Sequence, residues 1–360
     1  MTGRERFLGA IERTPIDRIP RYDGFWEETL NEYGKTPQEL AQEFEYDAVM
    51  FALDSSMRFP TRRIDLGTQE EGWDRYGFHM KRNKGRSTLH YLDFATAAPE
   101  DWEKYRHRFT VDKTGESRVD TDAFFLRTAP APSWQEAVDR INASGGDKFR
   151  FINFYGPWEG TWRHHGFENT LMDMICEPDM VEDMFDLYTD TALGALDYAL
   201  ELGMQVDAVW LVEDLGSTRA PLFSPDLYRR LLKPRHARIM DFAHAHGLKV
   251  VMHSCGEVSA FIPDLIDVGL DVLEALQANT TLHVARLKAQ YGSRLSFMGN
   301  ISVQKMAEGG SAIRREMEEK IIPAMQGGGY IYHSDHSIPP EVTYDKYCDV
   351  MRILDEIGKY

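Results

Sequence analysis

Cysteines are scarce in this sequence, and long apolar runs are absent. The three cysteines, Cys176, Cys255 and Cys348, are odd in number and far apart, which argues against a disulfide framework and favours a reducing compartment. No apolar run approaches the roughly 18 residues that a membrane-spanning helix needs. The opening stretch MTGRERFLGAIERTP lacks the apolar core of a secretory signal. We therefore expect a cytoplasmic protein that does not associate with membranes.

Basic residues are also in short supply. The chain has 41 Lys and Arg against 58 Asp and Glu, which gives a formal charge of −17 at pH 7. A field of this sign repels nucleic acids and anionic lipid surfaces at long range, so neither is an expected partner. A polyanionic substrate would need a locally positive pocket.

Low-complexity segments and Ser/Gly-rich linkers are missing as well. Instead, short apolar runs alternate with longer amphipathic segments along the 360 residues, which is typical of βα units and a parallel sheet. The eight expected strands are 18–25, 46–54, 149–157, 207–216, 248–256, 271–277, 295–302 and 329–337. The clearest helical patterns are 36–45, 224–247, 257–269, 311–329 and 343–360.

Eight strands that each precede a helix are the number needed to close a barrel. We therefore expect an α/β fold, a (β/α)8 TIM barrel, as a single domain over residues 1–360. An open, doubly wound sheet divided near residue 150 is the alternative, but no Gly-rich phosphate fingerprint follows an early strand. The irregular stretch 60–145 is expected to be an excursion between strands 2 and 3, a lid or insertion at the barrel mouth.

Polar residues recur where the expected strands end, which is the catalytic end of a TIM barrel. In chain order they are Asp23, Asp54, Tyr155, Glu159, Glu213, Asp214, His253, Cys255, Glu274, Gln277, Asn300, His333, Asp335 and His336. Helix caps and loops account for some of them. Their recurrence at strand after strand favours a shared site at the mouth.

The most specific local pattern is His253-Ser254-Cys255, at the end of KVVMHSCG. Residues two apart in a strand face the same way, so an imidazole and a thiolate would converge on one ion, as zinc prefers. The alternative is a buried cysteine that acts as a small apolar side chain. Cys176 and Cys348 lie in helical patterns and are expected to be core or surface thiols. Further ligands would come from other strand ends, namely His333, His336, Glu213, Asp214 or Glu274.

Two histidine pairs have less specific settings. His164 and His165 would either face a pocket or cap the next helix, and the sequence leaves both open. His244 and His246 lie at the expected end of a helix, where cationic side chains suit the helix dipole.

Longer motifs occur in the order and spacing of a known family. They are GPWEGTWRHHGFENTLMDMICEPDMVEDMFD (156–186), LFSPDLYRRLLKPRHARIM (222–240), VVMHSCGEV, LIDVGLDVLEALQA and FMGNIS. In these motifs the chain resembles, over nearly its whole length, the uroporphyrinogen decarboxylase superfamily. That superfamily includes uroporphyrinogen decarboxylase and the zinc-dependent, corrinoid-linked methyltransferases. The resemblance implies a (β/α)8 barrel and leaves the reaction open.

The decarboxylase branch is matched in part. There, an Arg-rich motif after strand 1 grips the substrate carboxylates, and an aspartate after strand 2 binds the pyrrole N–H groups. Asp54 stands where that aspartate would be. The Arg-rich motif is missing, because RIPRYDGFWEE offers only Arg18 and Arg21 before its acidic residues. An octa-anionic tetrapyrrole would meet acid there.

The methyltransferase branch is also matched in part. There, zinc is held by His-x-Cys on strand 5 and by a cysteine after strand 8. His253 and Cys255 match the first pair, and His336 stands where the late cysteine would be. A His/Cys/His set, with Glu274 as a carboxylate ligand, still suits zinc, while iron and manganese are alternatives.

The preferred hypothesis is a metal-dependent, corrinoid-linked methyltransferase, with zinc as the metal. It would move a methyl group between a small molecule and a corrinoid held by a separate partner protein, and a homodimer is a further expectation. The expected metal ligands are His253, Cys255, His336 and Glu274. The expected catalytic residues are Asp54, Tyr155, Glu159, Glu213 and Asp214, and the expected substrate-binding residues are Asp23, Trp162, Gln277, Asn300 and His333. The alternatives are a metal-free decarboxylase of a tetrapyrrole or another acid and a non-catalytic corrinoid- or substrate-binding barrel.

Overall fold

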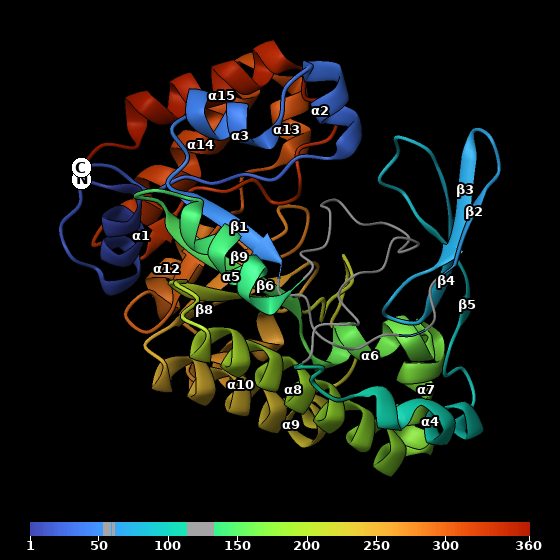
Figure 1. Ribbon diagram of the computed structural model, residues 1–360. Coiled ribbons are helices and arrows are strands. Elements are labelled where there is room, and N and C mark those ends of the chain that lie inside the picture. The colour runs from blue at the N-terminus through green and yellow to red at the C-terminus, as the bar shows by residue number, and fades with distance from the viewer. Residues whose placement is uncertain (53–58, 60–61, 114–132) are drawn as a thin grey trace.

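The barrel sheet of this protein has seven regular parallel strands. The computed structural model describes residues 1–52, 59, 62–113 and 133–360, so Asp54 lies outside the described residues. The strands follow one another around the sheet in chain order (Figure 1). They are β1 (Ala48–Ala52), β6 (Phe149–Tyr155), β7 (Ala208–Val212), β8 (Lys249–Ser254), β9 (Val272–Ala275), β10 (Ser296–Met298) and β11 (Tyr330–Ile331).

The eighth strand position of the barrel is occupied by an irregular segment and not by the regular strand expected at 18–25. The amide of Tyr332 donates to the Pro20 carbonyl (2.9 Å), and the Tyr22 amide donates back to Tyr332 (3.2 Å). On the other side, the Asp47 amide donates to the Arg21 carbonyl (2.9 Å). This segment therefore joins β11 to the start of β1 and closes the TIM barrel. Pro20 has no N–H to donate, which interrupts the regular ladder.

Helices surround the sheet in the expected alternation (Figure 1). They are α1 (Gly3–Glu12), α2 (Glu27–Tyr33), α3 (Pro37–Glu43), α4 (Pro99–Tyr105), α5 (Trp134–Ala143), α6 (Pro157–His165), α7 (Phe167–Cys176), α8 (Pro178–Glu201), α9 (Pro225–Leu231), α10 (Lys233–Ala245), α11 (Ile262–Asp267), α12 (Val284–Tyr291), α13 (Val303–Glu308), α14 (Gly310–Met325) and α15 (Tyr344–Ile357). The single helix expected at 224–247 is two helices, because Pro234 cannot donate to the preceding turn. The helix expected at 257–269 is a 3-10 turn, Ser259–Phe261, followed by α11.

The strand residues alternate between two cores, as a period of two requires. Phe149, Phe151 and Trp210 point into the barrel, where Phe7 of α1 packs against them. Their neighbours along the strands, such as Ile152 and Val209, pack against the outer helices. Inward and outward residues are both apolar, so the strands read as continuous apolar runs in the sequence.

The stretch between β1 and β6 carries a sheet of its own and is called the insertion. The antiparallel strands are β2 (Arg62–Asp65), β3 (Gln69–Trp73), β4 (Phe78–Asn83) and β5 (His90–Phe94). In Figure 1 this sheet stands beyond the arrowhead of β1, on the side of α6 and α7. The insertion therefore lies at the end of the barrel where chemistry is expected.

The paired histidines of α6 hold the end of the insertion. The Thr96 amide donates to the His164 carbonyl (2.8 Å), and the Thr96 hydroxyl lies 2.7 Å from His164 Nδ1. His165 Nδ1 contacts the Thr96 carbonyl at 2.5 Å, and its Nε2 contacts Asp173 at 2.9 Å. Both side chains are buried. They join the insertion to the barrel, and neither faces an open pocket nor caps the next helix.

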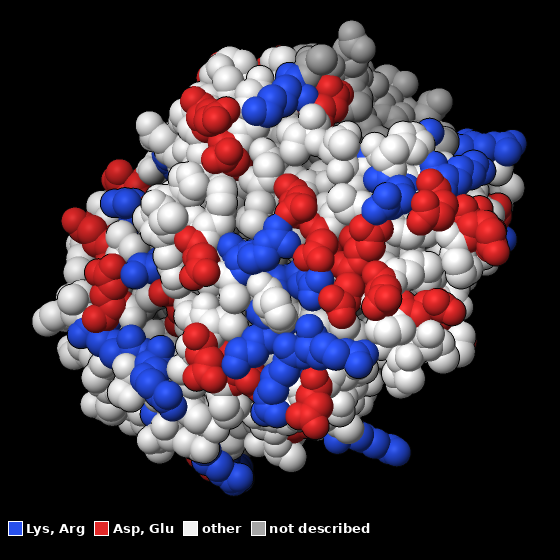
Figure 2. All heavy atoms as spheres, turned by 90° about the horizontal axis from the view of Figure 1, so that it is seen from below, with Lys and Arg blue, Asp and Glu red and all other residues white. Residues whose placement is uncertain are grey.

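Much of the acidic charge is matched locally on the outer helices. Figure 2 looks onto the side where α8, α9 and α10 lie in Figure 1, and basic and acidic side chains alternate across it. Arg235 and Arg238 of α10 pair with Asp186 of α8 at 2.5 and 3.0 Å. In the described parts of the chain, no helix combines the length and apolar character that crossing a bilayer would demand.

Candidate metal centre

Two neighbouring strand ends bring together a histidine, a cysteine and an aspartate. Val212 and His253 are register partners in β7 and β8. Asp214 follows β7 by two residues, Cys255 follows β8 by one, and the Cys255 amide donates to Asp214 Oδ1 (2.7 Å). This bond places the carboxylate beside the two side chains of the His-x-Cys motif.

Two glycines make this approach of the loops possible. Gly256 has φ +83°, and a Cβ on it would overlap the backbone of Gly216 in the loop after β7. Gly216 in turn lies against the backbone of Glu257. The two loops thus touch backbone to backbone, which only glycine permits.

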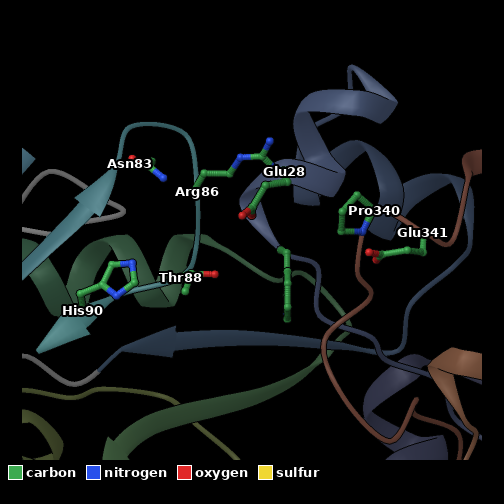
Figure 3. A pocket seen from close by; sticks show the side chains of 8 residues that line it. Glu28, Asn83, Arg86, Thr88, His90, Pro340 and Glu341 are labelled. Atoms are coloured by element: carbon green, nitrogen blue, oxygen red, sulfur yellow. The ribbon is translucent and has the colours of Figure 1, made fainter. Parts of the chain in front are cut away.

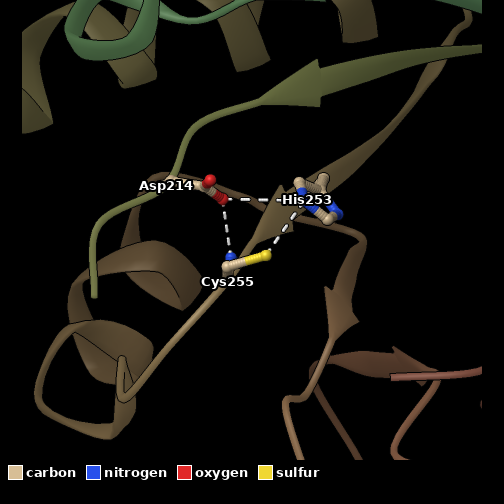
Figure 4. A group of neighbouring side chains, drawn as sticks. All are labelled: Asp214, His253 and Cys255. Atoms are coloured by element: carbon tan, nitrogen blue, oxygen red, sulfur yellow. Dashed lines mark hydrogen bonds and ion pairs between the residues drawn. The ribbon is translucent and has the colours of Figure 1, made fainter. Parts of the chain in front are cut away.

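The three side chains form a compact set of nitrogen, sulfur and oxygen donors. His253 Nε2 lies 3.5 Å from Cys255 Sγ and 3.6 Å from Asp214 Oδ1, and all three donor atoms lie within 4.8 Å of one another (Figure 4). Tetrahedral zinc with ligands at about 2.0–2.3 Å has ligand–ligand edges of roughly 3.3–3.6 Å. The donor set and these separations therefore fit zinc. Among the described residues, no other group of three such side chains meets this spacing.

Glu274 holds the His253 ring in the orientation that this set requires. His253 and Glu274 are register partners in β8 and β9, and His253 Nδ1 lies 2.5 Å from Glu274 Oε2. A carboxylate accepts, so Nδ1 carries the proton and Nε2 faces Cys255 and Asp214. Trp210 stacks beside the ring at 6.4 Å. Glu274, expected to be a metal ligand, is buried and holds the His253 ring through this contact.

The charges of the site act on one another. Burial alone would lower the pKa of His253, but Glu274 and Cys255 outweigh it, so this pKa lies well above its ordinary value. Burial raises the pKa of the Cys255 thiol, and His253 opposes that rise only in part. Metal binding at these two residues would therefore release protons.

The residues expected from strand 8 lie elsewhere at the mouth. His336, expected as a ligand, is exposed, and its ring packs edge-on against Trp26 at 5.8 Å. The structure does not bring it into the group of three, and Asp214, expected to handle protons, occupies the third place. His333 is buried, and its Nδ1 lies 3.2 Å from the second oxygen of Glu274. Glu274 therefore links the imidazoles of β8 and of the segment after β11.

Glu213 has a structural setting rather than the proton-handling one expected of it. It is completely buried, and its oxygens accept the amides of Trp158 (3.0 Å) and Glu159 (2.9 Å) and contact His236 Nε2 at 2.9 Å. The carboxylate thus anchors the first turn of α6 and the face of α10. Its oxygens are therefore occupied by donors of the scaffold.

Glu159 and Tyr155 belong to a second polar group, at the junction of β6 and α6. Glu159 is buried, accepts from Trp162 Nε1 (2.9 Å) and pairs with Arg163. Burial raises the pKa of Glu159 to about 7, Arg163 opposes the rise, and the negative charge of Asp214 adds to it. Arg163 lies 3.9 Å above the Tyr155 ring. Arg163 was not among the expected site residues, although its i,i+4 spacing from Glu159 predicts an ion pair on one helix face.

The remaining expected substrate contacts serve the scaffold. Asp23 accepts from the amide and hydroxyl of Ser334 (2.8 and 2.6 Å) and from Tyr347 (2.7 Å). The Asn300 amide donates to the carbonyls of Leu276 and Leu282 (2.6 and 3.1 Å) and is fully buried. Gln277 accepts the Gly256 amide (2.8 Å). These hydrogen bonds tie neighbouring loops together, and Gln277 Nε2 also donates to the Asn279 side chain (2.6 Å).

The chain is similar to proteins of known families. The family model for uroporphyrinogen decarboxylase (URO-D) matches residues 128–357. A methylcobamide:CoM methyltransferase, MtaA, of Methanosarcina barkeri is 27% identical over 51% of this chain and 50% of its own length. A uroporphyrinogen decarboxylase of Hydrogenovibrio crunogenus is 22% identical over 62% of this chain and 63% of its own. The chain thus spans only about half of the first relative and under two thirds of the second.

Among solved structures, a methyltransferase from Methanosarcina mazei superposes with a TM-score of 0.67 over 99% of both chains, at 19% identity. At that identity the superposition speaks for the fold alone. The family match, however, covers more than half of the residues, and the strand ends carry the family's motifs in order. The chain belongs to the uroporphyrinogen decarboxylase (URO-D) family.

Proposed function

We propose that this protein is a zinc-dependent methyltransferase that moves a methyl group between a small molecule and a corrinoid carried by a partner protein. The observation that carries the proposal is the Asp214, His253 and Cys255 group, with His253 oriented by Glu274. A relative is named as a methylcobamide:CoM methyltransferase, which supports this reaction class over decarboxylation.

In this proposal, Asp214, His253 and Cys255 hold the metal and leave a position open towards the mouth. Bound zinc acts there as a Lewis acid that lowers the pKa of a thiol or hydroxyl and stabilises the oxygen or sulfur atom that exchanges the methyl group. Asp214 has a side chain that is 39% exposed, so it marks the solvent side of the site. Glu274 and Trp210 keep His253 from turning away.

Glu159 is the proposed proton-handling group. Its pKa of about 7 lets it hold or release a proton near neutral pH, as a general acid or base must. When a methyl group leaves an ether for the corrinoid, the C–O bond breaks and the oxygen keeps the electron pair. A proton from Glu159 then neutralises that oxygen. Arg163 stabilises the carboxylate that remains.

The residues of the first barrel segment, at 18–25, support uroporphyrinogen decarboxylation less well than methyl transfer. Arg18 Nη1 pairs with Asp47 at 2.6 Å, and Arg21, which is buried, pairs with Asp355 at 2.8 Å. Neither guanidinium is free to grip substrate carboxylates. Asp54, which the decarboxylase reading depends on, lies outside the described residues.

The test combines elemental analysis with two assays. We expect about one zinc per chain, and loss of that zinc in Cys255→Ser with unchanged circular dichroism. Methyl transfer from free methylcobalamin to a thiol, followed by the cobalamin absorbance, should disappear in the same variant. A metal-free protein in which Cys255→Ser retains activity would contradict the proposal. Coproporphyrinogen formation from uroporphyrinogen would establish the decarboxylase instead.

A further inference from the structure

A separate pocket of about 470 Å³ opens where the insertion meets the barrel rim. Arg86 and Thr88 line it from the connection between β4 and β5, and His90 lines it from β5 (Figure 3). Trp26, Glu28 and Glu341 line it from the barrel. The volume is that of a small-molecule site. We propose that this pocket binds a small zwitterion that carries an alkylated ammonium group and a carboxylate.

The two walls are fastened to each other without any ligand. The Ser87 amide donates to Glu28 Oε1 and its hydroxyl to Glu28 Oε2, both at 2.8 Å. The Glu27 amide donates to the Ser87 hydroxyl at 3.1 Å. Burial would raise the pKa of Glu28, but the hydrogen bonds it accepts, chiefly from Ser87, and the positive charge of Arg86 outweigh burial and lower this pKa. Glu28 is therefore an ionised strut between insertion and barrel.

The insertion wall offers a cation, Arg86, whose positive charge acts on Glu28 across the pocket but which forms no ion pair among the described residues. The Arg86 side chain is exposed. The neighbouring cations of this connection are committed, since Arg82 pairs with Glu70 and Lys84 with Asp65. The planar fork of Arg86, with the Thr88 hydroxyl close by in the same wall, suits a ligand carboxylate.

The barrel wall offers an aromatic ring and an uncommitted anion. Trp26 is half-buried, and its ring is held against His336 at 5.8 Å. Glu341 is exposed, and its carboxylate forms no ion pair with any residue that the structure describes. An indole ring together with a carboxylate is the setting in which alkylated ammonium groups bind.

The charges of the pocket select the ligand class. An anion alone would face the carboxylates of Glu28 and Glu341, and a cation alone would face Arg86. A zwitterion leaves each charge matched, which is the arrangement with the least electrostatic cost. The barrel residues of the pocket come after the irregular segment at 18–25 and after β11, whereas Asp214, His253 and Cys255 come after β7 and β8. The pocket is therefore separate from the candidate metal centre. The proposal for it does not depend on the proposed reaction.

Calorimetric titration of the full chain tests the ligand class. The probe is glycine betaine, with two analogues that each lack one charge. 3,3-Dimethylbutanoate keeps the shape and carboxylate but replaces the cationic nitrogen with carbon, and choline keeps the cation without the carboxylate. We expect one glycine betaine per chain and at least tenfold weaker binding of both analogues. Absence of saturable glycine betaine binding, or equal binding of either analogue, would overturn the proposal.

Matched variants locate the site. Arg86→Gln and Glu341→Gln should each weaken glycine betaine binding at least tenfold. Lys84→Gln removes a cation from the same connection without touching the pocket lining and should bind within twofold of the parent. Glu341 is exposed, so its variant should keep the parent's circular dichroism. Parent-like binding of glycine betaine by either pocket variant would contradict the proposal of a zwitterion site. A loss of binding confined to Arg86→Gln would indicate a site for a carboxylate alone.

Discussion

At the scale of single residues, one buried carboxylate organises the metal centre. Glu274 is 1% exposed, and its two oxygens contact His253 Nδ1 at 2.5 Å and His333 Nδ1 at 3.2 Å. A carboxylate in this position fixes the tautomer of a ligating imidazole and raises its basicity. The orientation of His253 in the His-x-Cys motif therefore depends on a residue from the next strand, which the proposed metal site would need.

Glu274→Gln should weaken metal binding without removing a ligand. The amide keeps the size of the side chain but loses the charge that favours the Nε2 lone pair of His253, so we expect roughly 10–100-fold lower zinc affinity. Competition with a chromophoric chelator measures it. His336→Ala is the control, because His336 lies apart from the group of three. An equal loss in both variants would contradict this assignment.

Glu159→Gln should slow methyl transfer from an ether to cobalamin at the chemical step, the direction in which the leaving oxygen needs a proton. Because the pKa of Glu159 is about 7, a role as acid predicts that the parent's kcat falls as pH rises through about 7. The variant should have at least tenfold lower kcat, similar KM and no such fall between pH 6 and 8. A parallel loss of kcat across all pH values, with the slope retained, would assign Glu159 a structural role only.

At the scale of elements, the site exists because the ends of β7 and β8 can touch. The strands align Val212 with His253, and Gly216 and Gly256 then let the two loops meet at backbone distance. Cys255 directly precedes Gly256, and Asp214 lies two residues before Gly216. A side chain at either glycine would separate the carboxylate from the thiol.

Gly256→Ala should therefore cost both stability and metal. Its positive φ alone would cost about 1–2 kcal/mol, and the overlap with Gly216 should add to that cost. Gly247→Ala is the matched control, since Gly247 has φ +73° but no atom within 4 Å of a built Cβ. Denaturant unfolding and zinc content check both variants. If Gly256→Ala loses no more stability than Gly247→Ala and keeps its zinc, loop contact is not what builds the site.

At the scale of the whole molecule, the insertion is docked onto the barrel through buried ionisable groups. Arg163 of α6 lies above the rings of Tyr155 in β6 and Phe78 in β4, at 3.9 and 5.4 Å. Asp74, at the end of β3, is buried and accepts the amides of Tyr76 and Phe78 (2.8 and 3.3 Å). Burial raises the pKa of Asp74 to about 7, although the hydrogen bonds from those amides and the charge of Arg163 oppose the rise.

This contact predicts a pH-dependent stability. A carboxyl with a raised pKa in the fold is protonated there while it is ionised in the unfolded chain, so its contribution is lost as pH rises towards and through about 7. For Asp74 the loss is about 1 kcal/mol between pH 6 and 8. Asp74→Asn should be less sensitive to pH by that amount in denaturant unfolding. Asp93→Asn, an exposed change on β5, should keep the parent's pH dependence; identical slopes for the parent and Asp74→Asn would refute the assignment.

The barrel was readable from the sequence because its signals are local. Apolar runs with flanking caps and glycines set the strands and helices, and Thr36 with Glu39 forms a capping box at the start of α3. The motif of His253 and Cys255 was readable for the same reason, since a strand places alternate residues on one face. The irregular segment at Pro20 and the break before Pro234 depend on local chemistry that periodicity does not resolve.

The sequence by itself determined the family, the barrel and two of the three grouped donors, because those follow from residues that are neighbours along the chain. Only the tertiary structure decided that Asp214 rather than His336 lies beside them, that Glu274 contacts His253, and that Glu213, Asp23 and Asn300 form hydrogen bonds within the scaffold. Each of these outcomes depends on which strand ends meet and which backbone amides need an acceptor. Those partners are set by packing across the barrel, at separations of tens to hundreds of residues.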